Sequence, residues 1–205
     1  LRDMTASGLT NQMTWRFSVA SDPTVERFIV RDLDSRLSIR EKVAVDEWVL
    51  SGKRFHVMRD HPSHSLYPMS GGMWGGTHEA MPDMLSIVKG QHLSSKYVAD
   101  MDFLTKVIWP IAKVSVMQHD AFSCQTSGYG NTGWPMPRVG GEHIGSVYMD
   151  KYSELRGGDV QLLMTALKTQ PVACKDRGSV SLIPPFSRIG NSGSSSSSSR
   201  EGPNR

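Results

Sequence analysis

Short apolar runs and longer amphipathic stretches follow one another along the chain. Three apolar runs predict strands, at residues 27–30, 55–58 and 114–117. A helix is predicted over 38–52, because Ser38 and Glu41 stand in the capping-box relation and Gly52 ends the periodic pattern. The order strand, helix, strand is typical of α/β architecture.

Weaker patterns predict the remaining elements. Weak alternation predicts a short strand over 13–19. Helices are predicted over about 82–89 and from Asp100, which can cap the first turn, until Pro110 disturbs the pattern. Glycine, proline and polar residues predict loops at 70–76 and 123–145.

The length of 205 residues suits one domain. We expect a single α/β domain at residues 1–189, with a mixed, mostly parallel sheet flanked by helices, and a disordered Gly/Ser-rich tail at 190–205. The net charge of +3 comes from interspersed acidic and basic residues without a Lys/Arg stripe. This pattern excludes a typical nucleic-acid binder, and no apolar stretch approaches the length of a membrane span.

The two cysteines, Cys124 and Cys174, are too few for a disulfide framework and lack metal-ligand spacing. We interpret them as two ordinary half-buried thiols. A disulfide between them is the alternative.

An acidic pair gives the strongest chemical signal in the chain. Asp32 and Asp34 directly follow the strand at 27–30, which places them at the sheet edge where open α/β folds bind ligands. Two carboxylates suit Mg²⁺ or Mn²⁺, and such a cation can neutralise a diphosphate. The alternative is that the pair only caps the next helix.

Several blocks of residues resemble a known group of proteins. The chain is similar to an uncharacterised group of glycosyltransferase-like proteins, which looks like a branch of the nucleotide-sugar-dependent transferases of the GT-A fold. The resemblance covers about Met13 to Tyr148. It is carried by Arg-Asp-Leu-Asp-Ser-Arg (31–36), Arg-Glu-x-x-Ala-Val-x-Glu-Trp (40–48), Phe-His-Val-Met-Arg-Asp-His-Pro-x-His (55–64), Gly-Gly-Met-Trp-Gly (71–75) and His-Asp (119–120).

The resemblance implies a metal site and phosphate contacts. Asp32 and Asp34 match the Asp-x-Asp motif that holds Mn²⁺ or Mg²⁺ against the diphosphate, and His119 is the candidate third ligand. The alternative for His119 is an ordinary strand-end histidine. Arg31 and Arg36 would contact phosphate, or would only balance nearby acidic groups.

The resemblance also implies a sugar pocket. Gly71, Gly72 and Gly75 would let the backbone approach a donor or acceptor closely. Trp74 would be an apolar platform for a sugar face, or alternatively a core residue. Arg59 and Asp60 would form the pocket floor.

Histidines in the same region could be mistaken for a zinc site, because His56, His61 and His64 are spaced like metal ligands beside an acid. Only His61 and His64 share a loop. The resemblance assigns no zinc here.

Asp100 and Asp102 are the candidate general bases. Their segment resembles the Asp-Gln-x-Phe-Leu block of many sugar transferases, with Met101 in place of the glutamine. In an inverting enzyme one of these acids would accept the proton of the acceptor hydroxyl. The alternative is that they cap the helix and complement its dipole.

The chain departs from the GT-A pattern at its amino end, where only 31 residues precede Asp32. A nucleotide-binding half of parallel crossovers needs more residues than this. We therefore expect a fragment, or a reduced fold, of a glycosyltransferase that moves a sugar from a nucleotide-sugar donor to an acceptor with a divalent metal. The alternatives are an inactive or binding module of the same fold and a metal-dependent phosphoester hydrolase.

Overall fold

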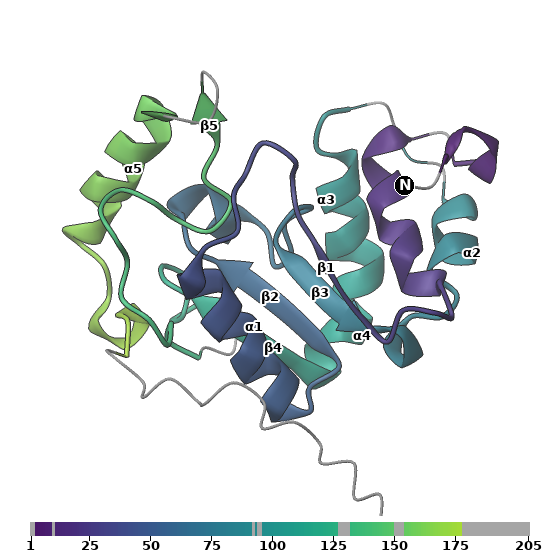
Figure 1. Cartoon of the computed structure of the whole chain (residues 1–205), viewed down its shortest axis with the longest axis horizontal. Coiled ribbons are helices and arrows are strands. Elements are labelled where there is room, and N and C mark those ends of the chain that lie inside the picture. The colour runs from purple at the N-terminus through teal and green to yellow at the C-terminus, as the bar shows by residue number, and fades with distance from the viewer. Residues whose placement is uncertain are drawn as a thin grey trace, which may run out of the picture.

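A computed structural model describes residues 3–9, 11–91, 93, 96–126, 132–149 and 154–177, and its centre is a four-stranded sheet in the order β1-β3-β2-β4 (Figure 1). The strands are β1 (Arg27–Val30), β2 (Phe55–Arg59), β3 (Trp74–Thr77) and β4 (Val116–Asp120). The three predicted strands at 27–30, 55–58 and 114–117 correspond to β1, β2 and β4, and β4 begins and ends later than predicted.

The sheet is mixed, as expected, but it is not mostly parallel. β3 pairs antiparallel with both β1 and β2, and only β2 and β4 pair in parallel among the described strands. The prediction of a mostly parallel sheet is wrong because it took the segment 70–76 for a loop, whereas β3 begins within it.

Glycines explain why β3 was missed. A Cβ on Gly75 would lie 2.6 Å from the carbonyl oxygen of Phe28, and one on Gly76 would lie 3.0 Å from the ring of Phe28. Side chains at these two positions would push β1 away. The glycines thus mark the close approach of two strands rather than a break in structure.

Helices cover both faces of the sheet. Helix α1 (Ile39–Ser51) lies across β2 and β4, and its predicted capping is present, since the Ser38 hydroxyl accepts from the Glu41 amide and Gly52 adopts a φ of 66° (Figure 1). The other face carries η2 (Gln12–Ser21), α2 (Met84–Lys89), α3 (Ala99–Phe103), the π-helical turn η5 (Leu104–Ile108) and α4 (Trp109–Ala112).

Residues 13–19 form part of the 3₁₀ helix η2, so the predicted strand there is wrong. The Asn11 side chain caps this helix by accepting from the Met13 amide. Thr14, Phe17 and Ala20 are buried and recur every third residue, which is the 3₁₀ period. The burial of this face, rather than the weak alternation, determines the local structure.

Two apolar cores follow from this layering. The larger core lies between the sheet and η2, α2 and α3, and contains Phe17, Phe28, Trp74, Phe103 and Leu104 among others. The smaller core lies on the α1 side and contains Ala44, Met58, Met73, Ala121, Trp134 and Ile144. Both cores are assembled from residues distant in sequence.

The carboxyl-terminal part adds a two-stranded ribbon of β5 (Tyr148–Met149) and β6 (Glu154–Leu155), and helix α5 (Gly157–Leu167). Short helical turns complete the chain: η1 (Thr5–Ser7), η3 (Pro62–Leu66), η4 (His78–Ala80), η6 (Lys113–Ser115) and η8 (Val172–Cys174). The predicted tail at 190–205 lies outside the described residues. Within the described part of the chain, every helix is too short or too polar to cross a membrane.

Cys124 and Cys174 form a disulfide with a Cα–Cα distance of 5.5 Å, so the interpretation of two free thiols is wrong. The sequence separation of 50 residues gave no local signal for this pairing. The bond ties the segment after β4 to η8.

Candidate functional site

Arg16 of η2 joins two of the aspartates that the sequence singled out. One amino group of its guanidinium pairs with Asp32 after β1, and the other lies 2.7 Å from a carboxylate oxygen of Asp100 in α3. The Asp32 side chain is 51% exposed, whereas that of Asp100 is 4% exposed. An open carboxylate and a buried one are therefore held by the same cation, and we call these three residues the Arg16 cluster.

Two glycines pack directly against the side chains of the Arg16 cluster. A Cβ on Gly71 would overlap a carboxylate oxygen of Asp100 and an amino group of Arg16, and a Cβ on Gly72 would overlap the carboxylate of Asp32. Only glycine leaves room for the carboxylates at this distance from the backbone. Gly71, Gly72, Asp32 and Asp100, all predicted site residues, thus lie together.

The rest of the acidic loop is open. Asp34 is exposed, and its carbonyl oxygen accepts from the Tyr148 amide at 3.2 Å. The guanidinium of Arg36 stacks over the Tyr148 ring at 4.1 Å from its centroid. Asp34 and Arg36 therefore stand at the surface beside the Arg16 cluster, within reach of a ligand.

Arg31 faces inward from the same loop. Its guanidinium pairs with Glu41 of α1 and donates to the Gly72 carbonyl at 3.1 Å. Burial lowers the pKa of Arg31 despite the neighbouring Glu41 carboxylate. Arg31 therefore links the acidic loop to α1 and to the glycine segment.

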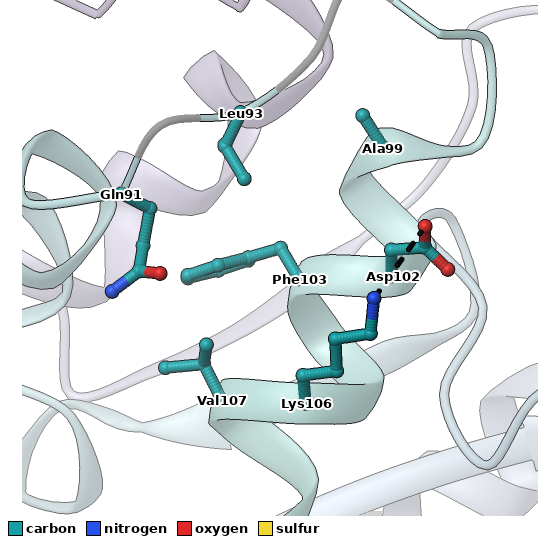
Figure 2. Close-up of a pocket in the computed structure, with 7 residues that line it drawn as sticks. All are labelled: Gln91, Leu93, Ala99, Asp102, Phe103, Lys106 and Val107. Carbon is teal, nitrogen blue, oxygen red and sulfur yellow. Dashed lines mark ion pairs between the residues drawn. The ribbon is translucent and has the colours of Figure 1, made fainter.

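Asp102 points away from Asp100. Its carboxylate lies 4.0 Å from the ammonium of Lys106, one helical turn further on, and its side chain is 51% exposed. Asp102 and Lys106 line a cavity of about 240 Å³ together with Phe103 and Val107. Figure 2 shows these side chains on α3 and η5. The structure therefore does not bring Asp102 into the Arg16 cluster.

His119 is buried in β4, away from the acidic pair. Its Nδ1 lies 2.8 Å from Nε2 of His56, and its Nε2 lies 3.1 Å from a carboxylate oxygen of Glu47. β1 and β4 form opposite edges of the described sheet, so β3 and β2 separate His119 from Asp32 and Asp34. The three predicted metal ligands do not converge, and both nitrogens of His119 are engaged.

The pair His56 and His119 makes stability depend on pH. Burial holds the pKa of His56 well below the ordinary 6.5 and also lowers that of His119. Below about pH 6.5 the unfolded chain therefore binds more protons than the folded chain. The free energy of unfolding is highest above that pH and falls on acidification. Each histidine contributes about 1.4 kcal/mol to this loss for every unit by which folding lowers its pKa.

We expect the ring signals of His56 and His119 in an NMR titration to change only below pH 6.5, and urea unfolding to require less denaturant at pH 5 than at pH 7. The exposed fraction of each ring is zero, so solvent does not weaken the effect. A midpoint at or above 6.5 for both rings would contradict the burial argument.

Other predicted pocket residues lie in the interior. Arg59 has no exposed surface and pairs with Asp120 at 2.5 Å, and Trp74 packs between Phe17 and Phe28 at centroid distances of 5.5 and 5.2 Å. Trp74 is therefore a core residue, as its alternative interpretation had it, and not an exposed sugar platform. Gly75 lies within β3 against β1.

Asp60 lies in a second buried network. Its carboxylate accepts from Arg40 at 2.8 Å, from Arg138 at 2.6 Å and from the Ile144 amide at 3.0 Å. Burial alone would raise the pKa of Asp60, and the two guanidiniums outweigh it and hold the pKa below its usual range. Asp60 therefore joins α1 and the 132–149 segment to the end of β2 instead of lining an open pocket.

Three histidines meet beside Asp60: His61, His64 and His143, which we call the histidine cluster. The centroids of the His61 and His143 rings are 4.4 Å apart, and that of His64 lies 5.6 Å from the first and 5.5 Å from the second. Burial, followed by the neighbouring imidazoles, lowers the pKa of His64 to about 3 and that of His143 to about 4. Both rings are therefore neutral at pH 7.

Sequence reasoning missed Arg16 and His143. Arg16 lies in a segment mistaken for a strand, and no local motif marks it. His143 lies in a predicted loop far from His61 in sequence, so that only the folded chain brings the two together.

The chain was compared with protein-family models, curated protein sequences and solved structures, and none of them matches it. The similarity to glycosyltransferase-like proteins therefore rests on the residue blocks alone.

Proposed function

We propose that the chain carries the metal-binding and acceptor side of a nucleotide-sugar-dependent glycosyltransferase. The observation that supports this most directly is the Arg16 cluster, in which Asp32 from the acidic motif and Asp100 from the candidate base segment share one guanidinium above Gly71 and Gly72. We therefore assign metal binding, substrate contact and proton transfer to residues that meet around Arg16.

The acidic pair fits a hard divalent cation. Asp32 and Asp34 follow β1 and are both exposed, although the Asp32 carboxylate also pairs with Arg16, and Leu33 between them is 98% exposed. His119 does not fit as a third ligand because it lies on β4, and β3 and β2 separate it from the acidic pair. When bound, Mn²⁺ or Mg²⁺ would neutralise charge on the donor diphosphate.

The proposed division of labour among the side chains follows from their exposure. Asp100 has 4% of its side chain exposed and lies against Gly71, and we assign its carboxylate the role of accepting the proton of an acceptor hydroxyl placed over Gly71. Arg16 would hold this carboxylate in position. Arg36, exposed on the acidic loop, would contact the phosphates.

One contact favours the alternative of an inactive module with the same fold. Arg16 already neutralises Asp32, so a cation must displace this ion pair before it can bind there. A phosphoester hydrolase is the third candidate, because the same carboxylates serve that chemistry.

We expect the chain to bind Mn²⁺, and Asp34→Asn to weaken that affinity about tenfold or more, because a carboxylate ligand is replaced by a neutral amide. Asp46→Asn is the matched control, since the Asp46 side chain is 45% exposed and pairs with Lys42 on α1. Titration calorimetry, with and without a nucleoside diphosphate, measures both affinities. Equal Mn²⁺ affinity in the two variants would exclude the acidic pair as the metal site.

Donor turnover then separates the three candidates. A transferase consumes a nucleotide sugar faster when a sugar acceptor is added, a hydrolase does so equally well without one, and an inactive module binds Mn²⁺ without turnover. Asp100→Asn should lower any transfer rate by about 100-fold or more, the usual contribution of a general base.

A further inference from the structure

We propose that His61, His64 and His143 form a binding site for Zn²⁺. Each of the three side chains offers one ring nitrogen, and these nitrogens lie within 4.8 Å of one another. No other group of three or more histidine, cysteine or acidic side chains in the described part of the chain is close enough to hold an ion. This inference does not depend on the proposed glycosyltransferase activity.

The second ring nitrogens of His61 and His143 have the kind of partner that metal-bound histidines use. Nε2 of His61 lies 3.0 Å from the carbonyl oxygen of Asp159 in α5, so this nitrogen carries the proton. Nδ1 of His61 then accepts from the Ser63 amide at 3.2 Å and lies 2.6 Å from the Ser63 hydroxyl, so an ion bound there would replace these two contacts. Nδ1 of His143 lies 3.0 Å from the Ser146 hydroxyl, which leaves Nε2 for a ligand. A metal-bound histidine commonly gives its second nitrogen to such a carbonyl or hydroxyl partner.

The third ring, that of His64, has a buried nitrogen, Nδ1, that lacks a hydrogen-bond partner in the described part of the chain. A buried polar atom without a partner costs free energy, which a ligand at this position would recover. The ring stands within 5.6 Å of both other rings, centroid to centroid, so one ion can serve all three.

The surrounding structure fixes the two segments that carry the ligands. Asp60 precedes His61 in the chain, and its carboxylate accepts from the amide of Ile144, which follows His143. Gly145 adopts a φ of 81°, and a Cβ there would overlap the Met73 side chain and lie 3.7 Å from the His64 ring. The 132–149 segment can therefore close over His64 only with glycine at this position.

The donor set favours Zn²⁺ over the hard cations proposed for the acidic pair. Three neutral imidazoles suit zinc and its neighbours in the transition series, whereas Mg²⁺ and Mn²⁺ prefer oxygen ligands. Three protein ligands leave a fourth position for water. The ion would clamp the loop after β2 to the 132–149 segment and, through the Asp159 carbonyl, to α5.

We expect tag-free protein, first stripped with a chelator, to bind one Zn²⁺ in titration calorimetry, and Co²⁺ in its place to show the visible absorption of a tetrahedral site. His143→Asn should weaken the affinity by about 100-fold or more, at least the loss seen on removing an outer-shell partner. Asparagine can keep the Nδ1 contact to Ser146 while it removes the nitrogen at Nε2.

The matched control is His78→Asn, because His78 is not one of the three clustered histidines, its Nδ1 contacts the Ala20 carbonyl at 2.9 Å, and asparagine can replace that contact too. Its Zn²⁺ affinity should equal that of the wild type. A hundredfold excess of Zn²⁺ over Kd should raise the Tm of the wild type by about 5–10 °C and leave that of His143→Asn unchanged. Absence of Zn²⁺ binding by the folded wild type, or equal affinity in His143→Asn and wild type, would overturn the site.

Discussion

Replacing Asp60 by asparagine should lower the free energy of unfolding by about 3–5 kcal/mol, the usual cost of breaking a buried ion pair. Asp60 has no exposed surface and is the shared partner of Arg40 and Arg138, each with 7% of its side chain exposed. With a neutral amide at position 60, two guanidiniums stand in the interior without a full counter-charge. Urea unfolding followed by tryptophan fluorescence measures the loss.

Asp176→Asn is the control for that measurement. Asp176 contacts the same Arg40 at 2.8 Å, but its side chain is 24% exposed, so water can replace the lost interaction. The expected loss is about 1 kcal/mol or less, as for surface ion pairs. If both variants lost the same free energy, burial would not be the reason for the importance of Asp60.

The elements that the sequence predicted well are those whose local chemistry and tertiary packing agree. Helix α1 has its cap, its periodic apolar face and its terminal glycine within one segment, and the structure has all three. β2 is buried at every position. A strand buried on both faces does not need alternating apolar and polar residues, so its mainly apolar run alone predicted a strand. Local consistency of this kind makes a segment predictable.

The errors occurred where contacts distant in sequence decide the conformation. β3 contains two of the glycines that local rules assign to a loop, and only the nearness of Phe28 explains them. The partner of Cys124 is 50 residues away, and His143 meets His61 only after the 132–149 segment has folded onto β2. No window of sequence contains these pairs.

The candidate site was predictable where local pattern places its residues, and unpredictable where distant contacts do. Asp32 and Asp34 stand at the end of a strand that the pattern marks clearly, and both are exposed in the structure, although Asp32 also pairs with Arg16. Asp100 could be selected by its segment, but its link to Asp32 runs through Arg16, whose position depends on the packing of η2. His119 was selected by its place after an apolar run, and the sheet order then puts it on the far strand from the acidic pair.

Replacing both cysteines by alanine should lower the free energy of unfolding by about 4 kcal/mol, since the disulfide closes a loop of 50 residues and limits the unfolded chain. Cys174 has no exposed surface, so the bond also anchors η8 to the segment after β4. For a chain of this size such a loss corresponds to a fall in Tm of about 8–16 °C.

A reducing agent should lower the Tm of the wild type by a similar amount and leave the double variant unchanged, which separates loss of the bond from loss of packing around the alanines. Disulfides persist in oxidising compartments, so protein made in a reducing cytosol should show the lower Tm until it is oxidised. Alkylation of two thiols in unfolded, non-reduced protein would show instead that the bond does not form.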